Sequence, residues 1–222
     1  MDLTVKLLVA DVFRREVHWA RSLAADLAAE EESRVGVPIN IPDGLPAKHT
    51  LHQERIFALE EEVAEHQQIR PLKIAILNLM PTKIQTETQI LRLISKSPIQ
   101  VSCDFMRISS HVSKHTPEDH LVTFYDTFES FEHKNYDGLI VTGAPLEDMR
   151  YEDVDYWDEF CRIVDWSQEH CFSTMYLCWG ALAGLYYLYG IPKKQLGSKL
   201  FGIFPQRLCD EYSFLTNGFD EV

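Results

Sequence analysis

One cysteine stands where a buried strand should meet a helix. Residues 172–177 form a short apolar run, which favours a buried strand, and a helical stretch follows that ends at residues 190–192. Cys178 lies at the junction. A nucleophile on such a turn is exposed at the end of a parallel sheet, beside a helix N-terminus whose positive end favours a thiolate. Gly180 lets the backbone pass close by. We interpret Cys178 as the centre of the chemistry, against the alternative of a buried core thiol.

The other cysteines fit this role less well. They are Cys103, Cys161, Cys171 and Cys209. Cys103 falls within an expected strand and Cys161 on the apolar face of an expected helix, where each resembles a small buried hydrophobe. No two cysteines show a zinc-ligand or redox-pair spacing, so we expect no metal. The usage is typical of a reduced, cytoplasmic protein.

Composition excludes several classes of partner. The 222 residues carry a formal net charge of −13 and no long Lys/Arg block, so nothing indicates nucleic-acid binding. No apolar run approaches the ~20 residues of a membrane span. The acidic balance is typical of a soluble protein.

A nucleophilic cysteine needs a base, most often histidine. All nine histidines precede Cys178, whereas in folds with a nucleophile elbow the base comes later in the chain. The upstream candidates are His111, His115 and His120, for which a surface loop is the competing interpretation. The chain closes on a turn-like sequence, residues 216–222. We therefore expect that the C-terminal part holding the base is missing.

Strand and helix patterns alternate along the chain, which predicts an α/β fold with a parallel sheet flanked by helices. Expected strands cover 72–79, 99–108, 136–145 and 172–177; expected helices cover 50–65, 84–96, 118–128 and 153–169. Residues 37–46 should be extended or turned, and Thr116 is a candidate N-cap. Sites in such sheets lie at the carboxyl ends of the strands. Three loops meet that description: 80–83, 142–148 and 178–180.

Residues 1–36 differ from the rest. They contain an Ala/Leu/Glu-rich helical run that is marginal without a partner. We interpret them as an N-terminal extension outside the fold, or as the product of a start codon placed too far upstream; an interaction helix is the alternative. We therefore expect residues 37–222 to be the N-terminal portion of a single domain.

At this point the motifs resemble a known family. The chain is similar to the homoserine O-acyltransferases of methionine biosynthesis over essentially all of 37–222. The matching stretches are VPINIPDGLP at 37–46, IRPLKIAILNLMPTK at 69–83, DGLIVTGAP at 137–145, DYW at 155–157, CWG at 178–180, LYGIPK at 188–193 and KLFG at 199–202.

The resemblance implies a fold similar to class I glutamine amidotransferases (flavodoxin-like), incomplete at the C-terminus, with a Cys–His–Glu triad. Cys178 matches the acyl-accepting cysteine, while the histidine and glutamate belong beyond residue 222. We therefore expect no useful turnover from the 222-residue chain alone. The backbone N–H of Trp179 would stabilise the oxyanion, with a second donor from the loop at 143–147. Lys83 and Lys199 match positions near the substrates, although each could be a solvated lysine.

Glu147 is expected to decide the acyl donor. The resemblance implies glycine here in succinyl-transferring members and glutamate in acetyl-transferring ones. A carboxylate at this position would repel the distal carboxylate of a succinyl group, at a cost of roughly 1 to 4 kcal/mol for like charges ~4 Å apart. The alternative is an exposed acid ahead of a helix. We predict acetyl-CoA.

The expected activity is thus homoserine O-acetyltransferase, with L-homoserine and acetyl-CoA as substrates and no further cofactor. Succinyl transfer, a cysteine hydrolase or amidotransferase on the same fold, and a non-catalytic fragment are the alternatives. No nucleic acid or membrane is expected as a partner, and a homodimer is left open.

Overall fold

The computed structural model describes residues 39–54, 56, 58–60, 70–111, 116–197 and 202–204. The expected extension, 1–36, lies outside them. The strands are β1 (Ile39–Ile41), β2 (Ala58–Glu60), β3 (Leu72–Leu77), β4 (Val101–Arg107), β5 (Tyr125–Thr127), β6 (Tyr136–Val141) and β7 (Cys171–Tyr176). The helices are α3 (Ala47–Gln53), α5 (Lys83–Ile94), α6 (Glu118–Phe124), α7 (Trp157–His170) and α8 (Trp179–Tyr189), with 3₁₀ turns η1 (Phe128–Ser130) and η2 (Tyr151–Asp153).

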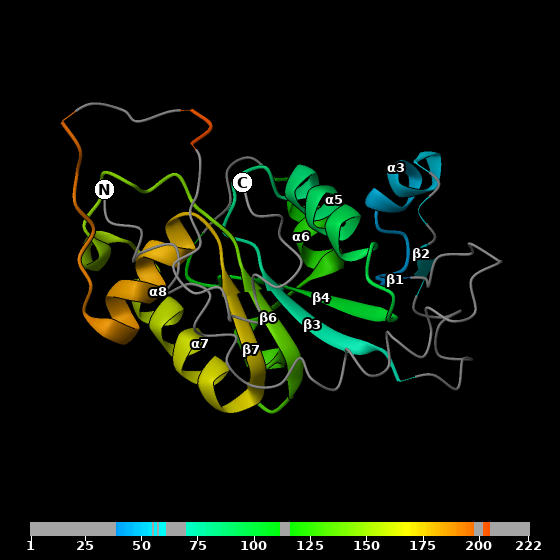
Figure 1. Ribbon diagram of the computed structural model, residues 1–222. Coiled ribbons are helices and arrows are strands. Elements are labelled where there is room, and N and C mark those ends of the chain that lie inside the picture. The colour runs from blue at the N-terminus through cyan, green and yellow to red at the C-terminus, as the bar shows by residue number, and fades with distance from the viewer. Residues whose placement is uncertain are drawn as a thin grey trace, which may run out of the picture.

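A parallel sheet forms the centre of the described fold (Figure 1). Its strand order is β2-β1-β4-β3-β6-β7, and β5 pairs with the end of β4; every pairing is parallel. Parallel strands need crossover connections, which here are mostly helices. The predicted α/β class, with a parallel sheet flanked by helices, is confirmed.

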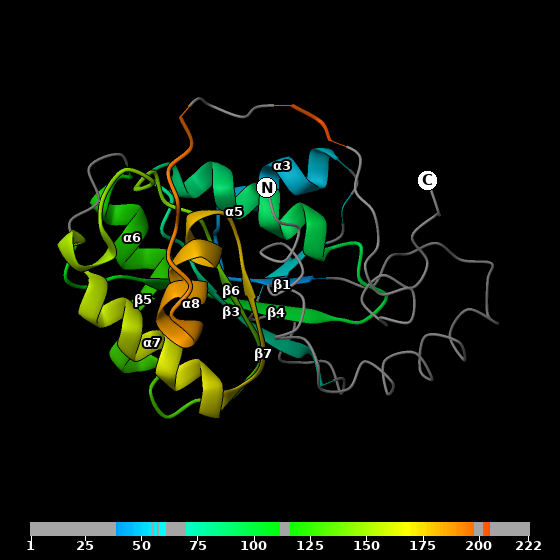
Figure 2. The same ribbon diagram turned by 60° about the vertical axis from the view of Figure 1, so that its left-hand side comes forward.

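Each face of the sheet is covered by its own hydrophobic cluster. In β3 the side chains alternate: Ala75 and Leu77 join the cluster that includes α7 and α8, whereas Ile76 joins the one that includes α3 and α5. Figure 2 shows α7 and α8 beside β7, with α5 and α3 across the sheet. Because both faces are buried, the central strands are apolar runs rather than alternating ones.

Three short strands depart from the sequence expectation. The stretch 37–46 was expected only to be extended or turned, yet it contains β1. The helix expected over 50–65 is α3 at 47–53, and β2 follows it, because pairing of Ala58 with Ile39 outweighs local helix propensity. The helix expected over 118–128 ends at Phe124, since the next residues pair with the end of β4 as β5. Residues 61–65 lie outside the described part.

Thr116 does not cap α6. Its hydroxyl donates to the carbonyl of Pro81 at 3.0 Å, and Pro117 occupies the cap position without a side-chain hydrogen bond. Thr116 instead ties the approach to α6 to the loop after β3.

The strand register brings the candidate loops to one edge of the sheet. Met106 of β4 is level with Leu77 of β3, Leu77 with Val141 of β6, and Val141 with Tyr176 of β7. The loops at 80–83, 142–148 and 178–180 therefore all leave the same carboxyl edge, as the sequence predicted.

We predict that Gly180→Ala destabilises the fold. A Cβ at this position would lie 2.5 Å from the carbonyl oxygen of Thr142 and 3.1 Å from Val141. Alanine gains about 1 kcal/mol of helix propensity over glycine, but overpacking against backbone costs about 1–3 kcal/mol. Urea denaturation should show a lower free energy of unfolding. Gly197→Ala, where a Cβ meets nothing within 4 Å, is the control; equal stabilities of the two variants would contradict the packing argument.

Candidate active site

Cys178 sits on a strained turn between β7 and α8, where the sequence placed it. Its φ of 52° and ψ of −119° make it the one non-glycine residue with positive φ among those described. Such a conformation costs of order 1–3 kcal/mol and persists only where the surroundings hold it. Leu177 N–H donates to the Val141 carbonyl, and Ala181 and Leu182 donate to the Cys178 carbonyl, so both flanks of the turn are fixed. The side chain is exposed.

The other described cysteines are poor nucleophiles. Cys103 is buried, and burial raises the pKa of its thiol well above the usual range. Burial raises the pKa of Cys161 to about 12, with the nearby Asp165 adding to the effect, and the pKa of Cys171 to about 12. A raised pKa keeps a thiol protonated and unreactive. Cys209 lies outside the described residues.

The backbone of Gly143 packs directly against Cys178. A Cβ added to Gly143 would lie 2.8 Å from Cys178 Cβ, 3.2 Å from Sγ and 3.6 Å from Trp179 N. Trp179 is the first residue of α8, so its N–H has no acceptor within the helix. A free helix N–H and a loop backbone thus flank the thiol, which is the arrangement an oxyanion site needs.

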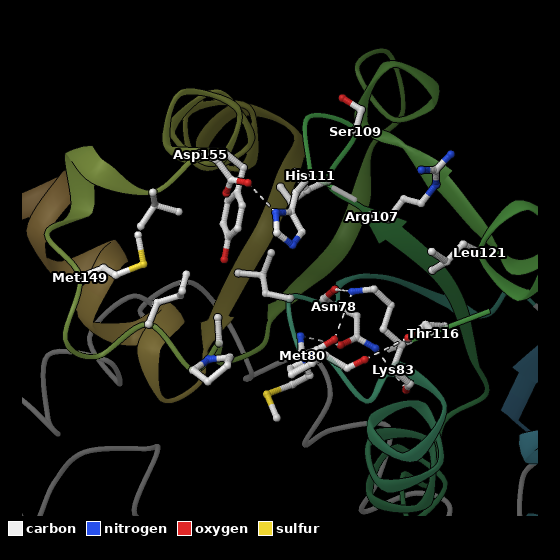
Figure 3. A pocket seen from close by; sticks show the side chains of 18 of the residues that line it. Asn78, Met80, Lys83, Arg107, Ser109, His111, Thr116, Leu121, Met149 and Asp155 are labelled. Carbon is white, nitrogen blue, oxygen red and sulfur yellow. Dashed lines mark hydrogen bonds and ion pairs between the residues drawn. The ribbon is translucent and has the colours of Figure 1, made fainter. Parts of the chain in front are cut away.

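A cavity of about 750 Å³ opens at the carboxyl edge of the sheet. Figure 3 shows it between Met149 on one side and Arg107 and Leu121 on the other, with His111 pointing into it. The loops after β3, β4 and β6 and the segment around η2 line it. Ala144 lines the cavity and is the next residue after Gly143, which packs on Cys178; Cys178 itself is not among the lining residues.

Lys83 is buried, although solvation in a loop was one interpretation of it. It lines the cavity, is 7% exposed, and its ammonium donates to the carbonyls of Asn78 and Met80. Burial lowers the pKa of Lys83 to about 8; the charge of Glu87 opposes that change, and Arg107 adds to it. Lys83 therefore brings a cation with a readily lost proton to the cavity wall.

A buried polar cluster lies next to Lys83, further from the cavity along α5. Glu87, one turn further along α5, is completely buried and accepts hydrogen bonds from Tyr125 at 2.5 Å and from His120 Nε2 at 2.9 Å. Asn78 donates its amide to Tyr125 at 2.8 Å. Burial, together with the charge of Glu87, raises the pKa of Tyr125 far above its usual range. The surface-loop interpretation of His120 is wrong, because α6 turns it inward onto Glu87.

His111 lies at the cavity and is held there by one carboxylate, Asp155, while a second, Glu159, fixes the residues just before it. Its Nδ1 lies 2.6 Å from Asp155, and the ring packs edge-on against Tyr156. The preceding loop is fixed by Glu159, which accepts the backbone N–H groups of Ser109 and Ser110 at 2.8 and 2.9 Å. Although burial opposes it, these hydrogen bonds, with those of the two hydroxyls, hold the pKa of Glu159 below its usual value. His115, the neighbouring candidate, lies outside the described residues.

The expected specificity residue, Glu147, lies outside the cavity lining. Glu147 is exposed in the loop after β6 and does not line the cavity, although it lies in the same loop as Ala144. Lys193, which the sequence did not single out, donates to the backbone carbonyls of Leu146, Glu147 and Met149 and so fixes this loop. The one sequence signal for Lys193 was its position after Pro192, at the end of the LYGIPK stretch. Lys199 lies outside the described residues.

The described part of the chain shows neither a metal-binding cluster nor a membrane-spanning helix. No group of three or more His, Cys, Asp or Glu side chains there could hold a metal ion. None of its helices is both long and apolar enough to cross a membrane.

Comparison with known proteins gives consistent results. A family model described as homoserine O-succinyltransferase matches residues 38–222. A protein of Bifidobacterium adolescentis named homoserine O-acetyltransferase is 62% identical over 84% of this chain and 54% of its own length. Proteins with the same name from Methanomassiliicoccus intestinalis and Acetivibrio thermocellus are 56% and 55% identical over 84% and 83% of this chain, each over 61% of its own length.

The chain therefore spans between about half and three-fifths of the length of these curated relatives. The range that the family model matches takes in the described strands and helices and the Cys178 turn. Because the family model covers most of the chain and these relatives exceed half identity over most of it, the chain belongs to the homoserine O-succinyltransferase family.

Proposed function

We propose that this protein transfers an acetyl group from acetyl-CoA to the hydroxyl of L-homoserine, a step of methionine biosynthesis, through a thioester on Cys178. The observation that carries the proposal is the exposed thiol on its strained turn, with the Gly143 backbone against it. The names of the relatives support the choice of reaction. Residues 37–222 would form the N-terminal portion of a single acyltransferase domain.

The chemistry proceeds by two acyl transfers. The Cys178 thiolate attacks the thioester carbonyl of acetyl-CoA; the bond to the CoA sulfur breaks, and CoA leaves as a thiolate that takes up a proton. The homoserine hydroxyl then gives its proton to a general base and attacks the acyl-cysteine, which frees Cys178. In both steps the Trp179 N–H would donate to the oxyanion. The second donor would come from the loop at 143–147, where Pro145 has no N–H to give.

Glu147 is the proposed selector of the acyl group. Its loop begins at Gly143, beside the thiol, and Lys193 holds the backbone of that loop. A carboxylate in this loop disfavours a second carboxylate on the acyl chain, so acetyl is preferred over succinyl. Succinyl transfer is the second candidate, favoured by the name of the family model. Lys83 and Lys199 are proposed to bind substrate, with acetyl-CoA as co-substrate and no other cofactor.

An amidotransferase or hydrolase on the same fold is the rival from another class. It would release ammonia from glutamine in the absence of CoA, whereas the proposed enzyme would not. A glutaminase assay without any thioester therefore separates the two classes.

Replacement of Cys178 by alanine should abolish acyl-enzyme formation. Incubation with acetyl-CoA followed by intact-protein mass spectrometry should show one acetyl group on the unmodified protein and none on Cys178→Ala. Cys161→Ala should behave like the unmodified protein, because that thiol is held protonated. An acetyl group that survives on Cys178→Ala would refute the assignment of the nucleophile.

Replacement of Glu147 by glycine should shift the acyl preference. Removal of one like charge relieves roughly 1 to 4 kcal/mol of repulsion, so the ratio of succinyl to acetyl transfer onto Cys178 should rise about tenfold or more. Asp148→Gly, the adjacent exposed acid, controls for loop flexibility and net charge. If both variants change the ratio equally, Glu147 has no special role.

Replacement of Lys83 by methionine should change how stability depends on pH. The folded pKa of about 8 lies below the usual 10.5. The unfolded chain therefore binds the Lys83 proton more tightly, and the cost of burying it is full below pH 8 and fades as the pH approaches 10.5. The stability of Lys83→Met relative to the unmodified protein should fall by about 2 kcal/mol between pH 7 and pH 10. A pH-independent difference in urea denaturation would contradict a buried ammonium.

A further inference from the structure

Arg107 is a partly buried cation that takes part in none of the ion pairs formed among the described residues. It is the last residue of β4 and lines the cavity. Its Nε is shielded from solvent and makes no hydrogen bond within the described residues. The other described arginines on helices α5 and α7, Arg92 and Arg162, are paired with Glu54 and Glu132. A guanidinium N–H kept from solvent without an acceptor is costly, and together with the unpaired charge at a cavity wall it points to an anionic ligand.

The strand register fixes where this cation lies relative to Cys178. Met106 of β4 and Tyr176 of β7 are level with each other across the intervening strands β3 and β6. Arg107 comes one residue after Met106, and Cys178 comes two residues after Tyr176. Neighbouring strands are ~4.8 Å apart, so the three gaps in this order separate the two side chains by roughly 14 Å along one edge.

The cavity reaches from Arg107 to Ala144, whose neighbour Gly143 packs against Cys178. Leu79, Pro145 and Leu146 give it apolar walls. Lys83 is buried and Arg107 partly buried in the lining, while its acids, Glu118, Asp153 and Asp155, are exposed. Asp155 is also engaged by His111. The cavity thus has an apolar wall on the side of the thiol and two cations on the side of β4.

We propose that Arg107 binds the pyrophosphate of the acyl-CoA, with the pantetheine arm lying along this cavity and its thioester at Cys178. The inference rests on the proposed function and adds to it the site of the co-substrate. Between its sulfur and its first phosphate, the arm has about as many bonds as the backbone of four amino-acid residues. When extended it therefore spans roughly 14 Å. That length matches the separation set by the sheet. Arginine's planar fork suits a phosphate bidentately.

The test compares the binding of CoA, 3′-dephospho-CoA and pantetheine by calorimetry. Arg107→Gln should weaken the binding of CoA and of 3′-dephospho-CoA roughly ten- to hundred-fold, as expected for lost hydrogen bonds to a charged group. Pantetheine has no phosphate, so its affinity should not change. Arg107→Lys, which keeps the charge, should retain part of the affinity. Arg70→Gln is the matched control, because Arg70 pairs with Asp137 at the opposite edge of the sheet.

A second readout tests the placement of the arm. Saturating CoA should slow the alkylation of Cys178 by iodoacetamide, which peptide mass spectrometry can map. In Arg107→Gln the same CoA concentration should no longer protect Cys178. Protection absent in the unmodified protein while CoA binds would overturn the proposal.

Other outcomes also decide it. Equal weakening of CoA and pantetheine would show that Arg107 only shapes the cavity. An effect on CoA that disappears with 3′-dephospho-CoA would move the contact to the 3′-phosphate and overturn the pyrophosphate assignment. Arg107-dependent CoA binding without acetylation of Cys178 would instead refute the proposed function and leave this site standing. If Arg107→Gln acetylates Cys178 as fast as the unmodified protein at limiting acetyl-CoA, the proposed function stands and the Arg107 site is refuted.

Discussion

The site depends on a close backbone contact that is possible because two of its residues are glycines. Gly143, just after β6, meets the Cys178 side chain, and Gly180, in the first turn of α8, meets the carbonyl of Thr142. A Cβ at either position would come within 3 Å of its neighbour. The end of β6 can therefore approach the Cys178 turn closely enough to hold its positive φ. The same contact brings the Gly143 backbone close to both the thiol and the Trp179 N, the groups that we propose for the oxyanion site.

Electrostatics divide the cavity edge into two regions. Around Cys178 the groups proposed to stabilise charge are backbone N–H donors, which would need no reorganisation when charge develops. Towards β4 the polar groups are side chains: Lys83 is buried next to Glu87, and Arg107 is partly buried. Burying such groups costs stability, and proteins commonly retain them for function. The division suits a ligand that is reactive at one end and anionic at the other.

The sequence predicted the framework well, because it is encoded locally. The apolar runs of β3, β6 and β7 and the Cys178 turn follow from residue order alone. What it missed depends on distant partners. His120 and Tyr125 reach Glu87 across 33 and 38 residues, so no local pattern distinguishes that buried glutamate from one on a solvated helix face. The three-residue strands β1, β2 and β5 exist only through pairing with their neighbours. The roles of Glu147 and Lys199 remain predictions.

The central claim is that the fold presents Cys178 to an acyl-CoA thioester with its oxyanion donors already in place. The most direct measurement is a high-resolution structure of the protein trapped after reaction with acetyl-CoA. The account predicts an acetyl group on Cys178 Sγ, with its carbonyl oxygen accepting from the Trp179 N–H and from a backbone N–H of the loop at 143–147. An acetyl group on another residue, such as Lys83, or a Cys178 adduct whose carbonyl oxygen faces solvent, would contradict it.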